Sequence, residues 1–246
     1  MRVAAVVVSH GHARELEESL PALRAQVDEL VVIANVPGSV PDGVDAVHNP
    51  QPLGFGANVN RGAALTSSEL VLSANPDAVP EPGAVDRLRA FAAEHPRCGV
   101  AGPRMVYPDG APQPSRRRFP TVLGTIVRRT PLRLVVPQRR HLHLGEAQPI
   151  EPVEADWMLG GFLLLRRAML DELGGFDEGF RLYGEDIDLQ YRAMRAGWER
   201  WYVPGAVVRH EHQAETDKRW LTRRTIWHWR GILRFVRKHP ERLRAL

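Results

Sequence analysis

Three carboxylates stand close together in the stretch "RLYGEDIDLQYRAMRAGW", residues 181–198, at Glu185, Asp186 and Asp188. The first turn of a helix favours negative charge, and Asp188 can pair with Arg192 four residues later, so helix capping accounts for Asp188. Capping does not account for three acids. Glu185 and Asp186 follow the turn "FRLYG", which predicts an exposed position at the lip of the helix. A carboxylate placed there can take a proton from a substrate hydroxyl if its neighbours keep it ionised.

A further carboxylate, Asp77, belongs to "LVLSANPDAVP", where Pro76 must end a buried strand because proline cannot donate to a strand ladder. An Asx-type turn explains "NPDA" without any function. The alternative is a metal ligand. A divalent ion carried on a substrate diphosphate needs only one or two protein carboxylates, so one aspartate is sufficient.

Histidine occurs in three His-x-His pairs, at His10 and His12, His141 and His143, and His210 and His212. Residues two apart on a strand share a face, so each pair could offer two imidazoles to one metal ion. No third nitrogen ligand follows at a zinc-like spacing, which favours a structural or surface role for the pairs. His210 is the exception, because it closes the strand "AVVRH" and can face the same crevice as Asp77.

Length and composition indicate one main α/β domain, since 246 residues with 43% hydrophobic content can bury a sizeable core. The single cysteine, Cys98, excludes an internal disulfide and a cysteine-based zinc site, which fits a reducing cytoplasm. The apolar run near the N-terminus is too short for a signal peptide, and "WMLGGFLLL" is too short for a membrane span. The expectation is a soluble or peripheral protein.

Positive charge is concentrated in two segments, although the formal net charge is only +4. Residues 101–140 hold nine arginines against one acid, and residues 217–246 hold ten basic residues against two acids. Such segments suit phosphates, anionic lipid or nucleic acid. Arginine enrichment from a GC-rich genome explains them equally well.

Short apolar strands alternate with amphipathic helices in the first hundred residues. Strands are expected at 3–9, 29–35 and 70–73, and helices at 13–26, 54–66 and 83–95. This order predicts a mostly parallel sheet with helices on both faces and ligands beyond the carboxyl ends of the strands.

The second half is less regular. Residues 103–152 contain nine prolines and predict a long loop region with a short helix near 121–129. After it, "WMLGGFLLLRR" predicts one strand, residues 185–196 a helix, "RWYV" and "AVVRH" a pair of strands, and residues 218–238 a final helix. That helix combines apolar and basic residues, which suits packing against the domain or binding to an anionic membrane.

Taken together, these stretches resemble family 2 glycosyltransferases of the GT-A fold, and among them the rhamnosyltransferase-like bacterial enzymes of polysaccharide assembly. The resemblance runs from about residue 3 to residue 240, and its most specific piece is "DWMLGGFLLLRRAMLDELGGFDEGFRLYGEDIDLQYRAMRAGW". It implies a catalytic domain over 1–216, with a nucleotide-sugar part over about 1–102 and an acceptor part over about 103–216. Residues 217–246 would form a basic amphipathic helix.

The resemblance also implies roles for individual residues. Asp77 and His210 would hold Mg²⁺ or Mn²⁺, Asp186 would deprotonate the acceptor hydroxyl, and Glu185 would orient or bind the acceptor. Asp156 and Trp157 would face the acceptor. The implied nucleotide-binding residues are Ser9, His10, Gly11, Asn35, Gly54, Asn60, Arg61 and Asn75.

The implied reaction is inverting transfer of a sugar, with rhamnose as a candidate, from a dTDP- or UDP-linked donor to a saccharide or lipid-linked acceptor. It would serve cell-surface polysaccharide synthesis, in the cytoplasm or on the inner face of the membrane. Ala34 stands where the family usually has an acid that contacts the nucleotide, which leaves the donor base open.

Three alternatives remain at this point. A sugar-phosphate nucleotidyltransferase would need a glycine-rich basic loop after the first strand, and "SHGHAREL" lacks it. An Arg-rich nucleic-acid-binding protein would want aromatic residues among the basic ones, and "SRRRF" offers only Phe119, so no nucleic acid is expected as a partner. A catalytically silent scaffold of the same family is the third.

Overall fold

The computed structural model describes residues 1–119, 149–211 and 223–243. Its strands are β1 (Val3–Ser9), β2 (Glu29–Ala34), β3 (Val47–His48), β4 (Leu70–Ala74), β5 (Ala78–Pro80), β6 (Cys98–Val106), β7 (Pro112–Gln113), β8 (Arg116–Arg117), β9 (Val153–Glu154), β10 (Trp157–Met158), β11 (Phe162–Arg166) and β12 (Glu199–His210). Its helices are α1 (Ala13–Arg24), α2 (Phe55–Ala63), α3 (Ala84–Glu94), α6 (Arg167–Leu173), α7 (Glu185–Arg195) and α9 (Arg223–Lys238), followed by the 3₁₀ helix η2 (Pro240–Leu243).

A ten-stranded sheet forms the centre, with the order β3-β2-β1-β4-β11-β6-β12-β5 along its main path and β7 and β9 paired to β6 and β12. Strands β3, β2, β1 and β4 are parallel to one another, as are β6 and β12, whereas β11 is antiparallel to both of its neighbours. Strands β8 and β10 form a separate two-stranded sheet. The predicted α/β architecture with a mostly parallel sheet is confirmed.

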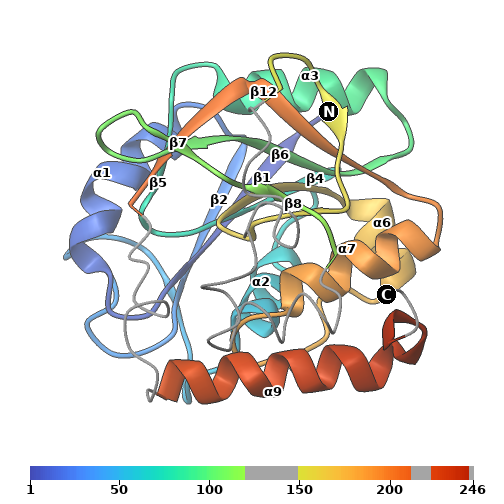
Figure 1. Ribbon diagram of the computed structural model, residues 1–246. Helices are drawn as coiled ribbons and strands as arrows, with labels where there is room; N and C mark the ends of the chain where they lie inside the picture. The colour runs from blue at the N-terminus through green and yellow to red at the C-terminus, as the bar shows by residue number, and fades with distance from the viewer. Residues whose placement is uncertain (120–148, 212–222, 244–246) are drawn as a thin grey trace.

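Both faces of the sheet are covered, because alternate residues of β1 enter different cores. Val3 and Val7 pack in a cluster with side chains of α1 and α3. Val6 and Val8 pack in a second cluster with side chains of α2, α6 and α7. Figure 1 shows α9 along the lower edge of the molecule, beneath α2 and α7. The continuous apolar run in β1 therefore reflects burial on both sides.

The short strands β3, β5, β7, β8 and β9 were not predicted, and three differences concern longer stretches. Strand β6 was not expected, because two glycines and a proline in "CGVAGPRMV" are unfavourable in strands. The packing explains those glycines, since a Cβ on Gly99 or Gly102 would lie 2.6 Å from the sulfur of Met169 or Met158. Residues 157–167 do not form one strand but divide at Gly160 and Gly161 into β10 and β11.

The third difference is β12. "RWYV" and "AVVRH" form one strand instead of two, with a shift of register between Val203 and Val207, around the Pro204–Gly205 dipeptide. The helix expected near 121–129 and residues 218–222 of the final helix lie outside the described residues, while α9 ends at Lys238 as expected. The division of the catalytic domain near residue 102 stays a prediction.

Candidate active site

Two strand ends bring Asp77 and His210 together. Residue 210 ends β12 and pairs with Ala78 at the start of β5, directly after Asp77. The Nε2 atom of His210 lies 3.4 Å from Oδ1 of Asp77 and 3.2 Å from Nδ2 of Asn75. His210 and Asp77 therefore lie side by side at these two strand ends, as the sequence suggested. His141, His143 and His212 lie outside the described residues.

The imidazole of His210 is oriented by Gln113, a residue of β7 that the sequence did not single out. The Oε1 atom of Gln113 lies 2.9 Å from Nδ1 of His210, and the Gln113 side chain is buried. An amide oxygen only accepts hydrogen bonds, so this contact places a hydrogen on Nδ1. The other ring nitrogen, Nε2, faces Asp77 and Asn75, and in the neutral imidazole it would be the nitrogen that offers a lone pair to a metal ion.

Asp77 and His210 fit a divalent ion that arrives with phosphate oxygens. They supply one carboxylate and one imidazole nitrogen, and the Asp77 side chain is 21% exposed. Within the described residues, no group of three His, Cys, Asp or Glu side chains could hold a metal ion. The donor set is therefore too small for a closed protein site but sufficient for Mg²⁺ or Mn²⁺ bound mainly by a diphosphate. The metal role itself stays a prediction.

A two-glycine turn places Asp186 beside this pair. The Oδ2 atom of Asp186 accepts a hydrogen bond of 3.0 Å from the Gly160 N–H, while the Gly161 carbonyl accepts one of 2.8 Å from the Asn75 N–H. A Cβ on Gly160 would lie 3.2 Å from Cβ of Asp186, and one on Gly161 would lie 3.1 Å from Nε2 of His210. Gly160 thus lies against Asp186, and Gly161 lies against His210, which is paired with Asp77. The turn brings these three side chains, which are far apart in the sequence, close together.

The side chains of Glu185 and Asp186 differ in exposure. Asp186 is half-buried, but Glu185 is buried, so the prediction of an exposed lip is wrong for Glu185. The reason is that the preceding turn packs against the start of α2, where the Phe55 N–H donates to the Arg181 carbonyl over 3.3 Å. The Oε2 atom of Glu185 makes no hydrogen bond with any residue that the structure describes.

The environment separates the two carboxyl groups chemically. Burial, reinforced by the charge of Asp186, raises the pKa of Glu185 to about 8. Burial also raises the pKa of Asp186, but N–H groups of Gly160 and Ile187 and the positive charge of Arg117 on β8 oppose that rise. The hydrogen bonds and the positive charge beside Asp186 therefore favour the negative charge of the pair on Asp186, whereas nothing comparable stabilises a charge on Glu185.

Glu185→Gln is expected to make stability less dependent on pH. A carboxyl whose pKa is raised on folding contributes its full stabilisation when the pH is below its ordinary pKa of 4.5. This contribution is lost as the pH rises toward the folded-state pKa of about 8. Urea unfolding should therefore show that the free energy of unfolding of the variant, relative to that of the parent, is higher at pH 8 than at pH 5. Glu17→Gln, on exposed surface of α1, serves as the matched control. An equal parent-to-variant difference at both pH values would contradict the assignment.

Helix α7 is fixed to β10 by Gln190, another residue that the sequence did not indicate. Its Nε2 donates to the carbonyls of Met158 (2.7 Å) and Asp186 (3.1 Å), and its Oε1 accepts from the Met158 N–H over 2.8 Å. The Gln190 side chain is fully buried. Asp186 is therefore carried by a helix whose position relative to the Gly160–Gly161 turn is set by hydrogen bonds.

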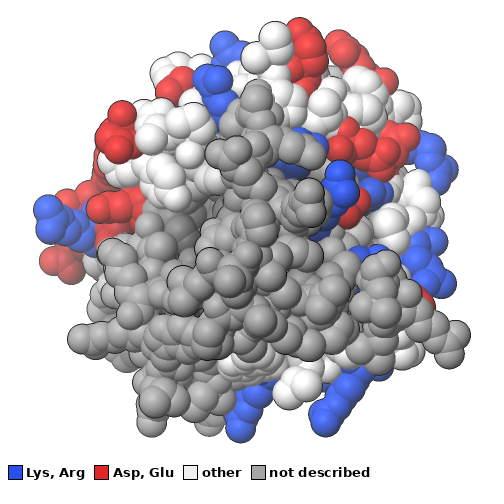
Figure 2. Space-filling view, viewed as in Figure 1, with Lys and Arg blue, Asp and Glu red and all other residues white. Residues whose placement is uncertain are grey.

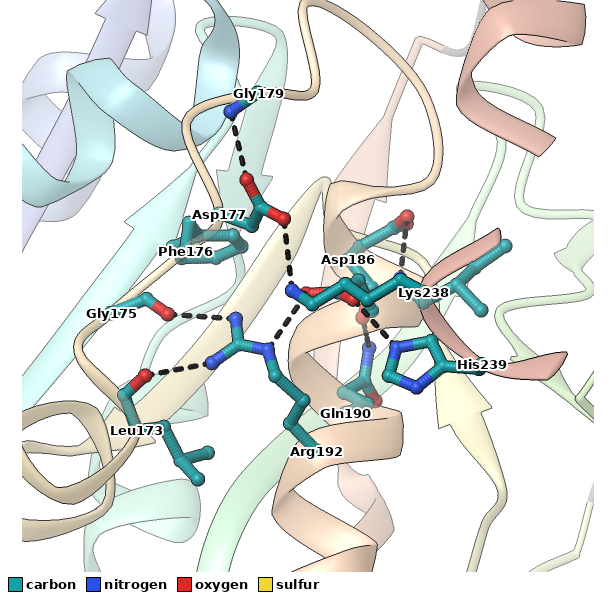
Figure 3. A network of polar contacts seen from close by, with 12 residues as sticks. Leu173, Gly175, Phe176, Asp177, Gly179, Asp186, Gln190, Arg192, Lys238 and His239 are labelled. Atoms are coloured by element: carbon teal, nitrogen blue, oxygen red, sulfur yellow. Dashed lines mark hydrogen bonds and ion pairs between the residues drawn. The ribbon is translucent and has the colours of Figure 1, made fainter. Parts of the chain in front are cut away.

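Asp188 has a different role from the one expected. Its predicted pair with Arg192 is confirmed, with Nε and Oδ2 2.7 Å apart, but the prediction of a cap is wrong because this helix start has no side-chain cap. The carboxylate is fully buried and also contacts Lys238 at 3.0 Å and His239 at 2.8 Å (Figure 3). It connects α7 to the end of α9.

The predicted nucleotide-binding residues near the first two strands form a loop cluster. Ser9 Oγ donates to the Ser39 carbonyl over 2.6 Å, and the Gly11 N–H donates to Ser39 Oγ over 3.0 Å. Asn35 Nδ2 lies 3.0 Å from His10 Nδ1 and donates to the Leu53 carbonyl over 3.0 Å. These bonds hold the loops beyond the carboxyl ends of β1 and β2. Contact with a nucleotide stays a prediction.

The predicted residues of α2 contact other parts of the chain. Asn60 exchanges hydrogen bonds with the Phe176 backbone, at 2.9 Å and 2.8 Å, and Arg61 donates to the Asn49 side chain. Gly54 precedes the helix, and a Cβ there would lie 2.5 Å from the Phe180 carbonyl oxygen. Asn60 and Gly54 thus contact the 176–181 segment that precedes α7, whereas Arg61 contacts the loop at Asn49. The nucleotide contacts of all three residues stay predictions.

Asp156 and Trp157 fix the segment that carries Arg117. Asp156 Oδ2 accepts a hydrogen bond of 2.8 Å from the Phe119 N–H, and buried Trp157 donates through Nε1 to the Arg118 carbonyl over 2.7 Å. The Arg117 guanidinium lies 5.5 Å from the centre of the Trp157 ring. Their predicted contact with the acceptor remains untested.

The fold is the GT-A fold of glycosyltransferases. Residues 22–229 match the family described as "Glycosyltransferase like family 2", and the chain belongs to this family. The chain is 32% identical to the N-acetylglucosaminyl-diphospho-decaprenol L-rhamnosyltransferase of Mycobacterium tuberculosis, over 87% of this chain and 77% of that protein. The predicted family and enzyme class are confirmed, and the nucleic-acid-binding alternative is not favoured.

Solved structures agree on the fold. GalNAc-T7 with UDP, GalNAc and Mn²⁺ superposes with a TM-score of 0.62 at 17% identity, over 85% of this chain and 43% of that one. TarS of S. aureus in complex with UDP gives a TM-score of 0.51 at 16% identity, over 84% and 57%. Among the described residues, every helix is too short or too polar to span a bilayer.

Proposed function

We propose that the protein is an inverting, metal-dependent glycosyltransferase of cell-surface polysaccharide synthesis. The observation that carries this proposal is the Gly160–Gly161 turn, which has Asp186 on one side and the Asp77–His210 pair on the other. A sugar transfer needs a proton acceptor on one side of the anomeric carbon and charge stabilisation on the other. Because neither glycine has a side chain, Asp186 and the Asp77–His210 pair can both approach the turn closely.

Each residue then has a distinct part in the reaction. Asp77 and His210 would hold Mg²⁺ or Mn²⁺, and the bound ion would supply charge stabilisation for the departing diphosphate. Asp186 takes the proton of the acceptor hydroxyl as that oxygen attacks the anomeric carbon. Attack and departure occur on opposite faces in a single displacement, so the configuration inverts. Glu185, neutral beside Asp186, leaves the negative charge on the proton acceptor.

The name of the mycobacterial relative supports a choice of substrates. That enzyme transfers rhamnose to N-acetylglucosaminyl-diphospho-decaprenol, as its name states. For the present protein we infer a dTDP- or UDP-linked donor, with rhamnose as the candidate sugar, and a saccharide linked through diphosphate to a polyprenol as the acceptor. Such an acceptor is embedded in a membrane, so the protein would work from the cytoplasm at the inner face of the cell membrane.

A thermal-shift series with dTDP-, UDP- and GDP-sugars, each with Mn²⁺ or Mg²⁺, tests the proposal. The correct donor with metal should raise the melting temperature of the parent, because a ligand that binds only the folded state stabilises it. Asp77→Ala should lose that shift, while Asp86→Ala, which removes an exposed aspartate of α3, should keep it. No shift with any donor, or an equal shift in parent and Asp77→Ala, would argue against the metal-bound donor site.

A further inference from the structure

A strongly basic pocket lies outside the proposed catalytic centre. It has a volume of about 750 Å³ and is lined by α9 and the 177–181 segment. Figure 2 shows Lys and Arg side chains at the lower edge of the molecule, where Figure 1 places α9. The charged residues that line the pocket are Asp177, Arg181, Arg230, Arg234, Arg237 and Lys238.

The positive charge of this pocket exceeds the negative charge beside it. Asp177 pairs with Arg234 at 2.7 Å and with Lys238 at 2.9 Å, and Lys238 also reaches Asp188. Arg230 and Arg237 make no ion pair or hydrogen bond with any residue that the structure describes. Unneutralised like charges that share one concave surface repel one another and attract an anion. One guanidinium group can donate two parallel hydrogen bonds to the oxygens of a phosphate, so a phosphate suits the pocket.

One wall of the pocket is apolar. Phe180, Trp227 and Leu233 line it, and Leu233 is 51% exposed. The guanidinium of Arg181 lies 5.5 Å from the centre of the Trp227 ring, and that of Arg234 lies 5.3 Å from the centre of the Phe180 ring. Cationic groups thus stand directly beside aromatic faces. The lining fits an anion that is covalently joined to an apolar chain.

The pocket adjoins the residues that lead into the catalytic helix. Gly231 of α9 packs so closely on Tyr183 that a Cβ would collide with the Tyr183 carbonyl oxygen. A Cβ on Gly184 would lie 3.6 Å from the Gly231 carbonyl carbon. Tyr183 and Gly184 directly precede Glu185 and Asp186. The helix that lines the pocket therefore packs directly on the turn that leads to the proposed proton acceptor.

We propose that the pocket binds the diphosphate of a polyprenyl-linked acceptor together with the first part of its prenyl chain, so that the attached sugar points toward Asp186. This inference rests on the proposed glycosyltransfer and specifies the part of the acceptor that the enzyme recognises. The phosphate contacts would come from Arg230 and Arg237, and the apolar contacts from Trp227 and Leu233. A lipid headgroup shares the phosphate chemistry, and the experiment must distinguish the two sources.

Calorimetric titration of the full chain with farnesyl diphosphate, in EDTA so that no metal-bound donor site forms, tests binding directly. Arg230→Ala/Arg237→Ala should weaken binding by roughly tenfold or more, because hydrogen bonds to charged groups are lost. Arg14→Ala/Arg24→Ala removes the same charge from exposed positions of α1 and should leave the affinity unchanged. Farnesol should bind more weakly than farnesyl diphosphate. Equal affinity in parent and pocket variant, or equal losses in both double variants, would overturn the proposal.

Two further measurements separate the remaining outcomes. If the pocket variant loses binding to phosphatidylglycerol vesicles but keeps its affinity for farnesyl diphosphate, the pocket is a headgroup site and the proposal is wrong. In turnover assays, the pocket variant should raise KM for the polyprenyl-diphosphate acceptor but not for the same saccharide as a simple alkyl glycoside. If no donor and acceptor give turnover, the proposed function fails, while the calorimetric result still decides whether the pocket binds a prenyl diphosphate.

Discussion

Asp186→Asn is expected to reduce kcat by roughly 10²- to 10⁴-fold, the range that a positioned general base contributes. Asparagine has nearly the same size and keeps an oxygen that can accept from Gly160 or Ile187, so the fold should be retained. It cannot take a proton from the acceptor hydroxyl. The thermal shift produced by donor and metal should stay as in the parent, because Asp77 and His210 are unchanged.

The pH dependence of kcat/KM distinguishes a base from a merely structural carboxylate. The kcat/KM of the parent should fall on the acid side of its pH profile as Asp186 becomes protonated. Because burial raises the pKa of Asp186, this acid limb should lie at higher pH than for an ordinary aspartate. Residual activity of Asp186→Asn should lack that limb. Asp86→Asn on the exposed face of α3 is the control. A kcat within about threefold of the parent, with the acid limb intact, would exclude Asp186 as the base.

Asp188→Ala is expected to lower the free energy of unfolding by about 3–5 kcal/mol, as when one partner of a buried ion pair is removed. Arg192, Lys238 and His239 all contact this one carboxylate (Figure 3). Arg192 is further fixed by the Leu173 and Gly175 carbonyls, at 2.9 Å and 2.8 Å, so it cannot swing out to solvent without losing those bonds. The variant therefore leaves the largely buried guanidinium of Arg192 without a counterion, while Lys238 keeps its pair with Asp177.

Urea denaturation near neutral pH measures this loss. Glu18→Ala breaks a surface pair with Arg209, in which the glutamate side chain is 64% exposed, and should cost about 1 kcal/mol or less. Similar losses in the two variants would show that the α7–α9 connection contributes no more than an exposed pair. A selective loss in Asp188→Ala would show that α9 is an integral part of the domain.

Local patterns were sufficient to predict β1, β2, β4 and the helices α1, α2 and α3. The β-branched run of β1 and the helical spacing in α1 are local signals, and strand ends that carry polar residues meet at one edge of a parallel sheet. Asp77 and His210 could be selected on that basis, whereas Asp186 was singled out by its place at a helix start and by the family resemblance. Strand β6 could not be predicted from its own sequence, because its glycines are explained only by the side chains of Met158 and Met169, which pack against them.

The supporting residues of the site are set by contacts that no local pattern reveals. Gln113 orients His210 from 97 positions away, and Asp188 binds His239 from 51 positions away. Glu185 belongs to a helix start that would ordinarily be exposed, and its burial depends on α2 and the 176–181 segment. Such roles follow from how distant segments pack, so sequence reasoning assigned Asp188 to its own helix end and missed Gln113 and Gln190.

The Gly160–Gly161 turn has one more consequence. Asp186 lies against one glycine and His210 against the next, and a Cβ at either position would lie within 3.2 Å of one of these two side chains. In the proposed reaction, a substitution at either glycine would therefore displace the proton acceptor or the metal ligand without changing either residue itself.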